Sequence, residues 1–190
     1  NLLGSGQSGH ISSVGYDLYC QMVTEAVAEL KGEPIPEPAE IKLELPVDAS
    51  LPASYVERED LRLEAYRRLA AVISAAEVAD IRAEWEDRYG PVPEDAEALL
   101  EVARLRAECV RTGVTDVTVT KGPGFGGPKF VARISPLALR TSATIRLDRL
   151  YKGSVYKAEP QQLQLHLNSA GSIIDDLVSA LADLVPEDEG

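Results

Sequence analysis

The spacing of hydrophobic positions divides the chain into segments with different predicted structures. In residues 14–30 the apolar side chains recur every three or four positions, which predicts an amphipathic helix. Gly32 follows the last turn as a stop signal. Three prolines at alternate positions in residues 33–38 then favour an extended connector. We therefore place a domain boundary after residue 35, so that residues 1–35 precede a C-terminal domain formed by residues 36–190.

The middle of the chain combines one predicted strand with three predicted helices. In residues 41–45 apolar and charged side chains alternate, which is typical of a half-buried strand. Helical spacing follows, and the expected helices span approximately residues 57–73, 75–89 and 93–113. Ser74 and Glu77 have the spacing of a capping box, in which each side chain bonds to a free amide at the helix start. The second of these helices is therefore expected to begin after Ser74.

The last third of the chain changes to a mostly two-residue period. Alternation predicts short strands, which lie near residues 114–119, 130–134, 154–157 and 162–167. Residues 141–152 fit a strand as well as a helix, and we interpret them as a helix that ends at Gly153. Residues 173–185 are expected to form the final helix. Segregated helices and strands predict an α+β fold, namely an N-terminal helical extension followed by a helix-rich domain with a small, mainly antiparallel sheet.

Composition narrows the possible class of protein. The chain has 190 residues and a net charge of −12, and no stretch is apolar for long enough to cross a membrane. Cys20 and Cys109 are too few for a disulfide framework, so they are interpreted as reduced thiols of a cytoplasmic protein. The acidic balance argues against a stand-alone nucleic-acid binder. Most of the negative charge lies in residues 33–113, which contain nineteen acidic and ten basic residues.

Few residues suggest a cofactor or catalytic site. The glycine-rich segment Lys121–Lys129 lacks the hydroxyl residue of a phosphate-binding loop and precedes a predicted strand, so it is interpreted as a hairpin connection. His10 and His166 are the only histidines, and no cysteine cluster accompanies them. Neither a zinc site nor a Ser-His-Asp triad is predicted from such a set. We therefore expect no metal, cofactor or catalytic residue in this chain.

The helix predicted for residues 75–89 carries an unusual surface. Asp80, Glu84 and Asp87 lie within about 60° of one another around the helix axis. We call these three residues the acidic face; Arg88 lies at its margin, and the apolar residues Val78, Ile81, Trp85 and Tyr89 are on roughly the opposite side. Like charges at this spacing repel by a few tenths of a kcal/mol per pair. The face is either a solvated surface or a docking surface for an arginine-bearing partner.

Several of these segments resemble one protein family over nearly the whole chain. The run Asn1-Leu2-Leu3-Gly4, followed by Gln7-Ser8-Gly9 and by residues 14–19, resembles the end of the translocation motif in transcription-repair coupling factors and their RecG-type helicase relatives. Residues 61–69 and 84–90, with Pro93, resemble the C-terminal domain of the same factors. The order of these segments is preserved. The candidate remnant of the translocation motif consists of Gly4, Gln7, Ser8 and Gly9.

The resemblance implies a specific role for the chain. Members of the family are bacterial ATP-driven DNA translocases that remove stalled RNA polymerase and recruit UvrA through an N-terminal UvrB-like module. Their ATP and Mg sites would lie upstream of this chain. The C-terminal domain docks on the UvrB-like module, masks UvrA binding and restrains translocation on double-stranded DNA. The family's contact residues fall on Glu84, Asp87 and Arg88, and Asp80 extends that patch.

An alternative hypothesis assigns the chain a structural role. The apolar stripe of residues 14–30 is expected to pair between copies if it lacks its neighbours. The chain would then be a structural or self-association module of the same translocase.

Overall fold

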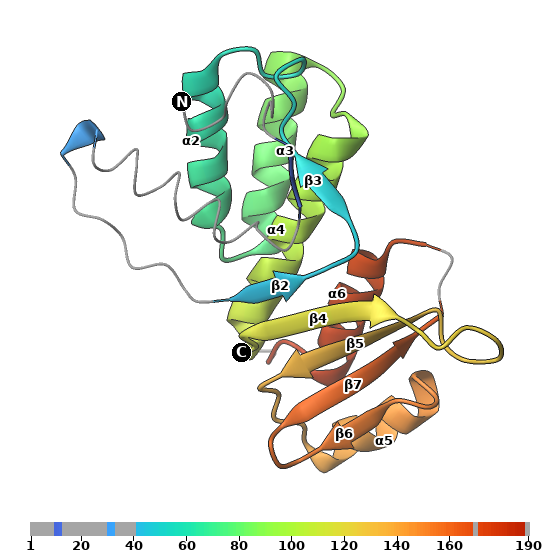
Figure 1. The fold of residues 1–190 in the computed structure, drawn as a ribbon. Helices are drawn as coiled ribbons and strands as arrows, with labels where there is room; N and C mark the ends of the chain where they lie inside the picture. Colours follow the sequence, from blue (N-terminus) through green and yellow to red (C-terminus); the bar gives the residue numbers. More distant parts are fainter. Residues whose placement is uncertain (1–9, 13–29, 33–40, 169–170, 189–190) are drawn as a thin grey trace. The chain divides into compact units, whose positions relative to one another are not determined.

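The computed structural model describes residues 10–12, 30–32, 41–168 and 171–188, and the chain divides into two compact units (Figure 1). The first unit contains residues 47–107 together with the described residues before position 40. The second unit contains residues 41–46 and the chain from residue 108 onward. Residues 41–46 thus belong to the second unit, although residues 47–107, which follow them in the sequence, belong to the first.

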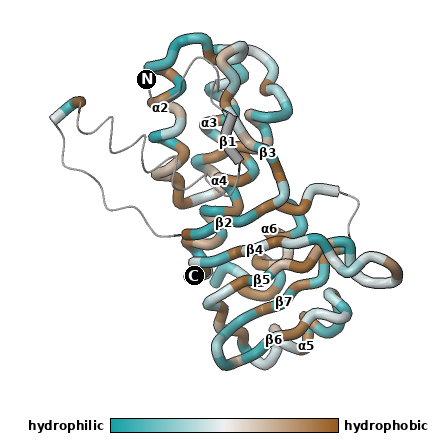
Figure 2. The backbone as a smooth tube through the Cα atoms, viewed as in Figure 1, coloured by the Kyte–Doolittle hydropathy of each residue, from teal (hydrophilic) through white to brown (hydrophobic). Residues whose placement is uncertain are grey.

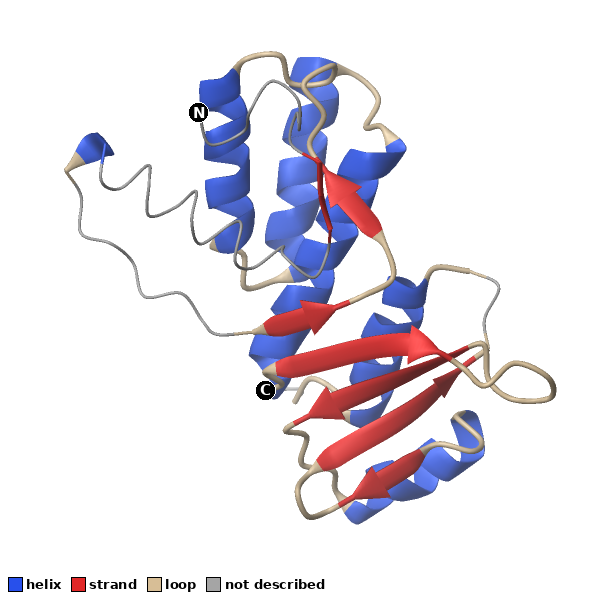
Figure 3. Ribbon diagram, in the orientation of Figure 1, coloured by secondary structure: helices blue, strands red, loops and turns tan. Residues whose placement is uncertain are grey.

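The first unit is mainly helical (Figure 3). Its helices are α2 (Glu59–Ala70), α3 (Ala75–Tyr89) and α4 (Glu94–Thr112), of which α4 continues into the second unit. Two three-residue strands, β1 (His10–Ser12) and β3 (Asp48–Ser50), pair antiparallel. The three helices predicted for residues 57–73, 75–89 and 93–113 are confirmed within three residues at each end. The β1–β3 pair was not predicted from the sequence.

A buried tyrosine connects two segments in the core of the first unit. Tyr66 is fully buried, as are Leu69 and Leu99. The Tyr66 hydroxyl accepts a hydrogen bond of 2.9 Å from the backbone amide of Leu51. This bond satisfies an amide that would otherwise be buried without a partner, which costs about 1–3 kcal/mol. The bond therefore fixes the segment after β3 against α2.

The second unit is a five-stranded sheet with two helices. The strand order is β2-β4-β5-β7-β6, and the strands are β2 (Lys42–Glu44), β4 (Asp116–Lys121), β5 (Phe130–Ser135), β6 (Val155–Lys157) and β7 (Gln162–Leu167). β2 pairs parallel with β4, and all other neighbours are antiparallel. The helices α5 (Thr141–Leu150) and α6 (Ile173–Leu184) contact each other. The predicted α+β class with a small, mainly antiparallel sheet is confirmed.

Strand alternation separates a buried face of this sheet from an accessible one. Leu163, Leu165 and Leu167 of β7 are buried, whereas Gln164 and His166 between them are half-buried. The same alternation continues across β4 and β5, because their registers bring buried residues opposite one another. His166 therefore lies on the face away from the leucines, as the alternation predicts. The segment that fitted both periods is helical, as α5.

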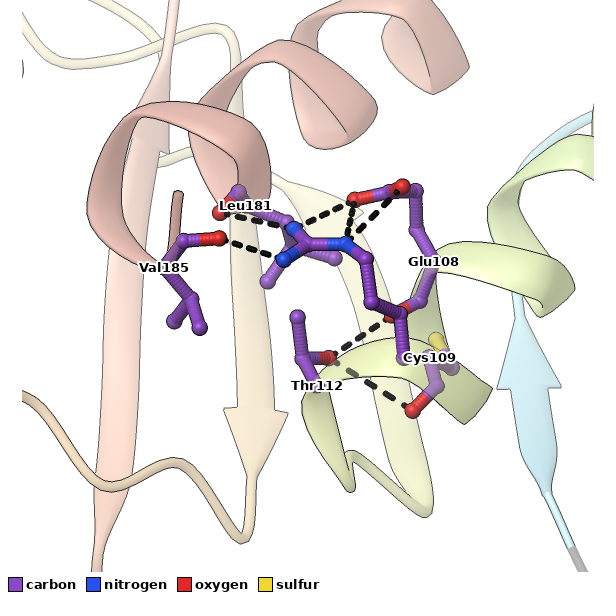
Figure 4. Close-up of polar contacts among 6 residues, drawn as sticks. Glu108, Cys109, Thr112, Leu181 and Val185 are labelled. Carbon is purple, nitrogen blue, oxygen red and sulfur yellow. Dashed lines mark hydrogen bonds and ion pairs between the residues drawn. The ribbon is translucent and has the colours of Figure 1, made fainter. Parts of the chain in front are cut away.

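An arginine joins two helices within the second unit (Figure 4). The Arg111 guanidinium, from the last turn of α4, donates a 2.6 Å hydrogen bond to the carbonyl of Val185 and a 3.4 Å bond to that of Leu181. Glu108 pairs with the same guanidinium at 2.8 Å. The last carbonyls of a helix lack partners in their own helix, so Arg111 supplies a donor to the carbonyl of Val185. The carbonyl of Leu181 also accepts from the Val185 amide at 2.8 Å.

Two sequence predictions fall outside the described residues. Of the helix predicted for residues 14–30, only Leu30 is described, and it is helical together with the following residue, Lys31. The predicted domain boundary after residue 35 also lies outside the described ranges. Both stay predictions.

Candidate functional surface on helix α3

Helix α3 is held in the first unit by its apolar side. Val78, Ile81 and Trp85 are each exposed by less than 5%. The predicted capping box is confirmed, because the Glu77 amide donates to the Ser74 hydroxyl at 3.3 Å and the Ser74 amide donates to the Glu77 carboxylate at 3.1 Å. Burial on one side and capping at the start fix the rotation of the helix. The acidic face is consequently turned away from the core.

The four predicted site residues share this outer side of α3. Asp80, Asp87 and Arg88 are exposed, and Glu84 is half-buried. Within the described part of the chain, Asp80 and Asp87 form no ion pair. Both carboxylates are thus exposed and without a basic partner among the described residues.

Glu84 differs from the other two carboxylates because it is already paired. It forms an ion pair with Arg68 of α2 and a weaker one with Arg88 one turn away, at 3.4 Å. The hydrogen bond from Arg68 is the main cause that lowers the pKa of Glu84, and the positive charges of both arginines add to it. Arg68 thus offsets part of the repulsion that the sequence pattern implied. The sequence did not single out Arg68, because it lies sixteen residues away on another helix.

The depressed pKa of Glu84 predicts a pH-dependent contribution to stability. Since its folded pKa lies below the unfolded value, the stabilisation is present above the unfolded pKa and is lost as the pH falls through the folded value. We expect Glu84→Gln to reduce the free energy of unfolding at pH 7 by about 0–1 kcal/mol, because the pair is partly exposed. Urea titrations at neutral and acidic pH measure this difference. A difference that persists at a pH below both values would contradict the assignment.

A shallow hollow adjoins the acidic face. It has a volume of about 260 Å³ and lies between α2 and α3, where it is lined by Arg68, Ala71, Val72, Glu77, Asp80 and Ile81. The Asp80 carboxylate and the paired Arg68 thus border a recess with an apolar floor. This is the geometry in which an arginine or lysine side chain can bury its stem and place its charge at a carboxylate.

Tyr55 contacts the C-terminal end of α3, next to this surface. Its hydroxyl donates toward the carbonyls of Gly90 at 2.8 Å and Trp85 at 3.1 Å, where α3 ends. Its ring meets that of Tyr89 edge-on at 5.6 Å, and the Arg88 guanidinium lies 5.1 Å from the centre of the Tyr89 ring. Burial raises the pKa of Tyr55, with further contributions from Glu86 and Tyr89. These contacts orient Arg88, and the sequence reasoning missed the role of Tyr55.

The described residues test only some of the other sequence predictions. Gly4, Gln7, Ser8 and Gly9 lie outside the described residues, so the translocation-motif remnant stays a prediction. Cys109 is buried, in line with a packing role. Across the described ranges there is no group of three or more side chains able to hold a metal ion, and no helix there is long and apolar enough to cross a membrane.

Comparison with known proteins identifies relatives of the chain. Residues 45–126 match the TRCF domain family. The transcription-repair-coupling factor of Mycobacterium bovis is 42% identical over 202 residues, which cover 97% of this chain. That of Myxococcus xanthus is 36% identical over 156 residues, or 77% of this chain, and that of Staphylococcus haemolyticus is 42% identical over 117 residues, or 60%.

The matches cover only a small part of these relatives. This chain spans 16% of the Mycobacterium bovis protein, 13% of the Myxococcus xanthus protein and 10% of the Staphylococcus haemolyticus protein. Among solved structures, the crystal structure of the C-terminal domain of a transcription-repair coupling factor has the same fold. It aligns with a TM-score of 0.59 at 16% sequence identity and covers 80% of this chain and 93% of that domain.

Proposed function

Because the chain belongs to the transcription-repair coupling factor family and contains the C-terminal domain of such a factor, we propose that this domain regulates the rest of its protein by docking. The docking partner is the UvrB-like module near the N-terminus of the full-length factor. Docking covers the UvrA-binding surface of that module and restrains an ATP-driven DNA translocase. This chain itself carries no catalytic step in the proposal.

The observation that carries the proposal is the exposure of Asp80 and Asp87 on a helix whose opposite side is locked into the core. A rigid helix presents its charges at fixed spacing, which suits bidentate contacts with arginines of a partner. Arg88, held over Tyr89, adds one positive charge at the margin for a partner carboxylate. The partner surface is therefore expected to be basic with one acidic position.

The pairing of Glu84 explains how such a contact remains reversible. A partner arginine that reaches Glu84 competes with Arg68 and Arg88, so one ion pair is exchanged for another. Exposed ion pairs contribute only about 0–1 kcal/mol each. A contact built from a few such pairs opens when another partner, here RNA polymerase, engages the factor.

The test uses the full-length factor. We expect Glu84→Ala combined with Asp87→Ala to raise basal ATPase activity and UvrA binding, because the domain no longer covers the UvrB-like module. A gain of about 5- to 150-fold corresponds to typical coupling energies between sites. ATP turnover without polymerase and UvrA pull-down measure the two effects.

The matched control is Asp148→Ala combined with Glu159→Ala. It removes the same charge from exposed positions in the second unit and is expected to leave both values unchanged. If the α3 variant is folded and both of its values stay at the parent level, the docking proposal is wrong. If the control variant shows the same increase, the effect follows net charge and not the acidic face.

A further inference from the structure

The basic residues of the second unit are segregated along the chain. Residues 117–158 contain eight basic residues and one acidic residue, Asp148, although the whole chain carries a net charge of −12. The basic residues are Lys121, Lys129, Arg133, Arg140, Arg146, Arg149, Lys152 and Lys157. None of them forms an ion pair within the described residues. The segment therefore presents uncompensated positive charge in an otherwise acidic protein.

The arginines of the first unit behave differently. Six of them are paired with carboxylates, namely Arg58, Arg67, Arg68, Arg82, Arg88 and Arg104. The contrast shows that the unpaired charge of residues 117–158 is a local feature and not a property of the whole surface. Unpaired basic side chains on one unit attract a polyanion.

The loop between β4 and β5 extends from the end of the sheet (Figure 1). At its base the Gly122 amide donates to the Lys129 carbonyl at 2.7 Å, and the Lys129 amide donates to the Asn168 side-chain oxygen at 3.1 Å. A Cβ on Gly122 would lie 1.7 Å from the Pro128 oxygen, so a side chain cannot be accommodated there without a backbone shift. Gly124 has a φ of 93°, which favours glycine. The loop conformation is thus specified by its sequence.

This loop presents an aromatic ring at full exposure. Phe125 has a relative exposure of 112%, and the loop between β4 and β5 shows hydrophobic colour at its end (Figure 2). Leaving a phenylalanine in water forgoes about 1.5–3 kcal/mol of burial. Both neighbouring residues are glycines, so no adjacent side chain covers the ring. Lys121 and Lys129 flank it as exposed cations.

A hollow lies at the same end of the second unit. Its volume is about 390 Å³, and the lining includes Arg149, Lys152, His166 and Asn168, together with Asp176 of α6. Asn168 is also the residue that holds the base of the β4–β5 loop, so the hollow and the loop are adjacent. We call Lys121, Lys129, Arg149 and Lys152 the basic end. The lysines of the β4–β5 loop and the basic residues that line the hollow are therefore connected through the base of the loop. The same loop carries the exposed ring of Phe125.

We propose that this end of the second unit binds a nucleic-acid strand, with phosphates at the basic end and one base stacked on Phe125. Sequence-tolerant binding of single strands combines these elements, a basic track for the backbone and an aromatic side chain for a base. An acidic protein segment would use the cations but would leave the exposed ring unexplained. The inference does not depend on docking by the acidic face, which lies in the other unit.

The test measures binding of the 190-residue chain to a labelled single strand and to the corresponding duplex by fluorescence anisotropy. Oligonucleotides of about 20 nucleotides cover the site sizes expected for such surfaces. We expect single-strand binding that weakens as salt rises, because bound counterions are released from the phosphates. Phe125→Ala is expected to weaken it about 5- to 100-fold, since stacking on an aromatic residue is lost.

A second variant tests the cations. Lys121→Gln combined with Lys129→Gln is expected to weaken binding and to reduce the slope of log affinity against log salt by about 1.4, which corresponds to two phosphate contacts on a single strand. The charge-matched control is Lys42→Gln combined with Arg58→Gln, both exposed and outside the basic end. Ile145→Ala, which removes another exposed apolar side chain, is the control for Phe125→Ala.

Three results would overturn the proposal. The first is no detectable binding at low salt by a chain whose circular dichroism shows that it is folded. The second is that Phe125→Ala weakens binding no more than Ile145→Ala does, whether the chain prefers the single strand or the duplex. The third is displacement of the single strand by polyglutamate of equal charge at equal concentration, which would indicate an acidic protein partner.

Discussion

Trp85→Ala is expected to lower the free energy of unfolding by about 3–5 kcal/mol. Trp85 is 3% exposed and lies on the same buried side of α3 as Val78 and Ile81. Its removal leaves a cavity that neighbouring helices fill only in part, so both the transfer free energy and the packing contacts are lost. Domains are stable by only about 5–15 kcal/mol, so this loss takes a large share of the margin. Urea unfolding followed by far-ultraviolet circular dichroism measures it, because Trp85 is the only tryptophan and its fluorescence disappears with it.

The control for this variant is the next residue along the helix. Glu86 is exposed, so Glu86→Ala is expected to change stability by no more than about 0.5 kcal/mol. A loss below about 1 kcal/mol for Trp85→Ala would mean that α3 does not pack through this side chain. The acidic face would then lack the fixed rotation on which the docking proposal depends.

Leu165→Ala is expected to cost about 2–5 kcal/mol. Leu165 is fully buried on β7, opposite Ala132 of β5, which is also fully buried. The residue directly opposite is a small alanine, so it does not fill the space that the leucine side chain leaves. The same urea titration by circular dichroism measures the loss of stability.

The adjacent residue provides an internal comparison. Gln164 is half-buried on the other face of β7, and Gln164→Ala is expected to be far milder. Because side chains alternate between faces of a strand, a shift of register by one residue would exchange the two outcomes. Equal losses for both variants would contradict the register of β5 with β7.

Elements with a strong period were predictable from the sequence. The buried residues of α3 recur at helical spacing and follow a capping box, so local signals agree on where the helix begins and which side is buried. The alternation in β7 likewise predicted its buried face. By contrast, β1 and β3 have only three residues each, too few to show a period. Their pairing depends on contacts between distant segments, which a local pattern does not contain.

The candidate site was predictable in its residues but not in its charge balance. Helical geometry alone placed Asp80, Glu84 and Asp87 on one side of α3. It could not show that Arg68 reaches Glu84 from α2, because helix packing determines that contact. Nor could it show that the Tyr55 hydroxyl bonds at the end of α3. The basic end was missed for a related reason, since the net charge of the whole chain obscured a local excess of the opposite sign.

The strand order of the second unit has a consequence for how the protein behaves when concentrated. Both outermost strands of the five-stranded sheet, β2 and β6, have three residues, and each carries exposed lysine. Short, charged borders offer few free amides and carbonyls on which a further strand can be added. These edge strands therefore disfavour fibril-like growth by strand addition. Other molecules are then expected to bind through side chains on the helices and loops of the unit.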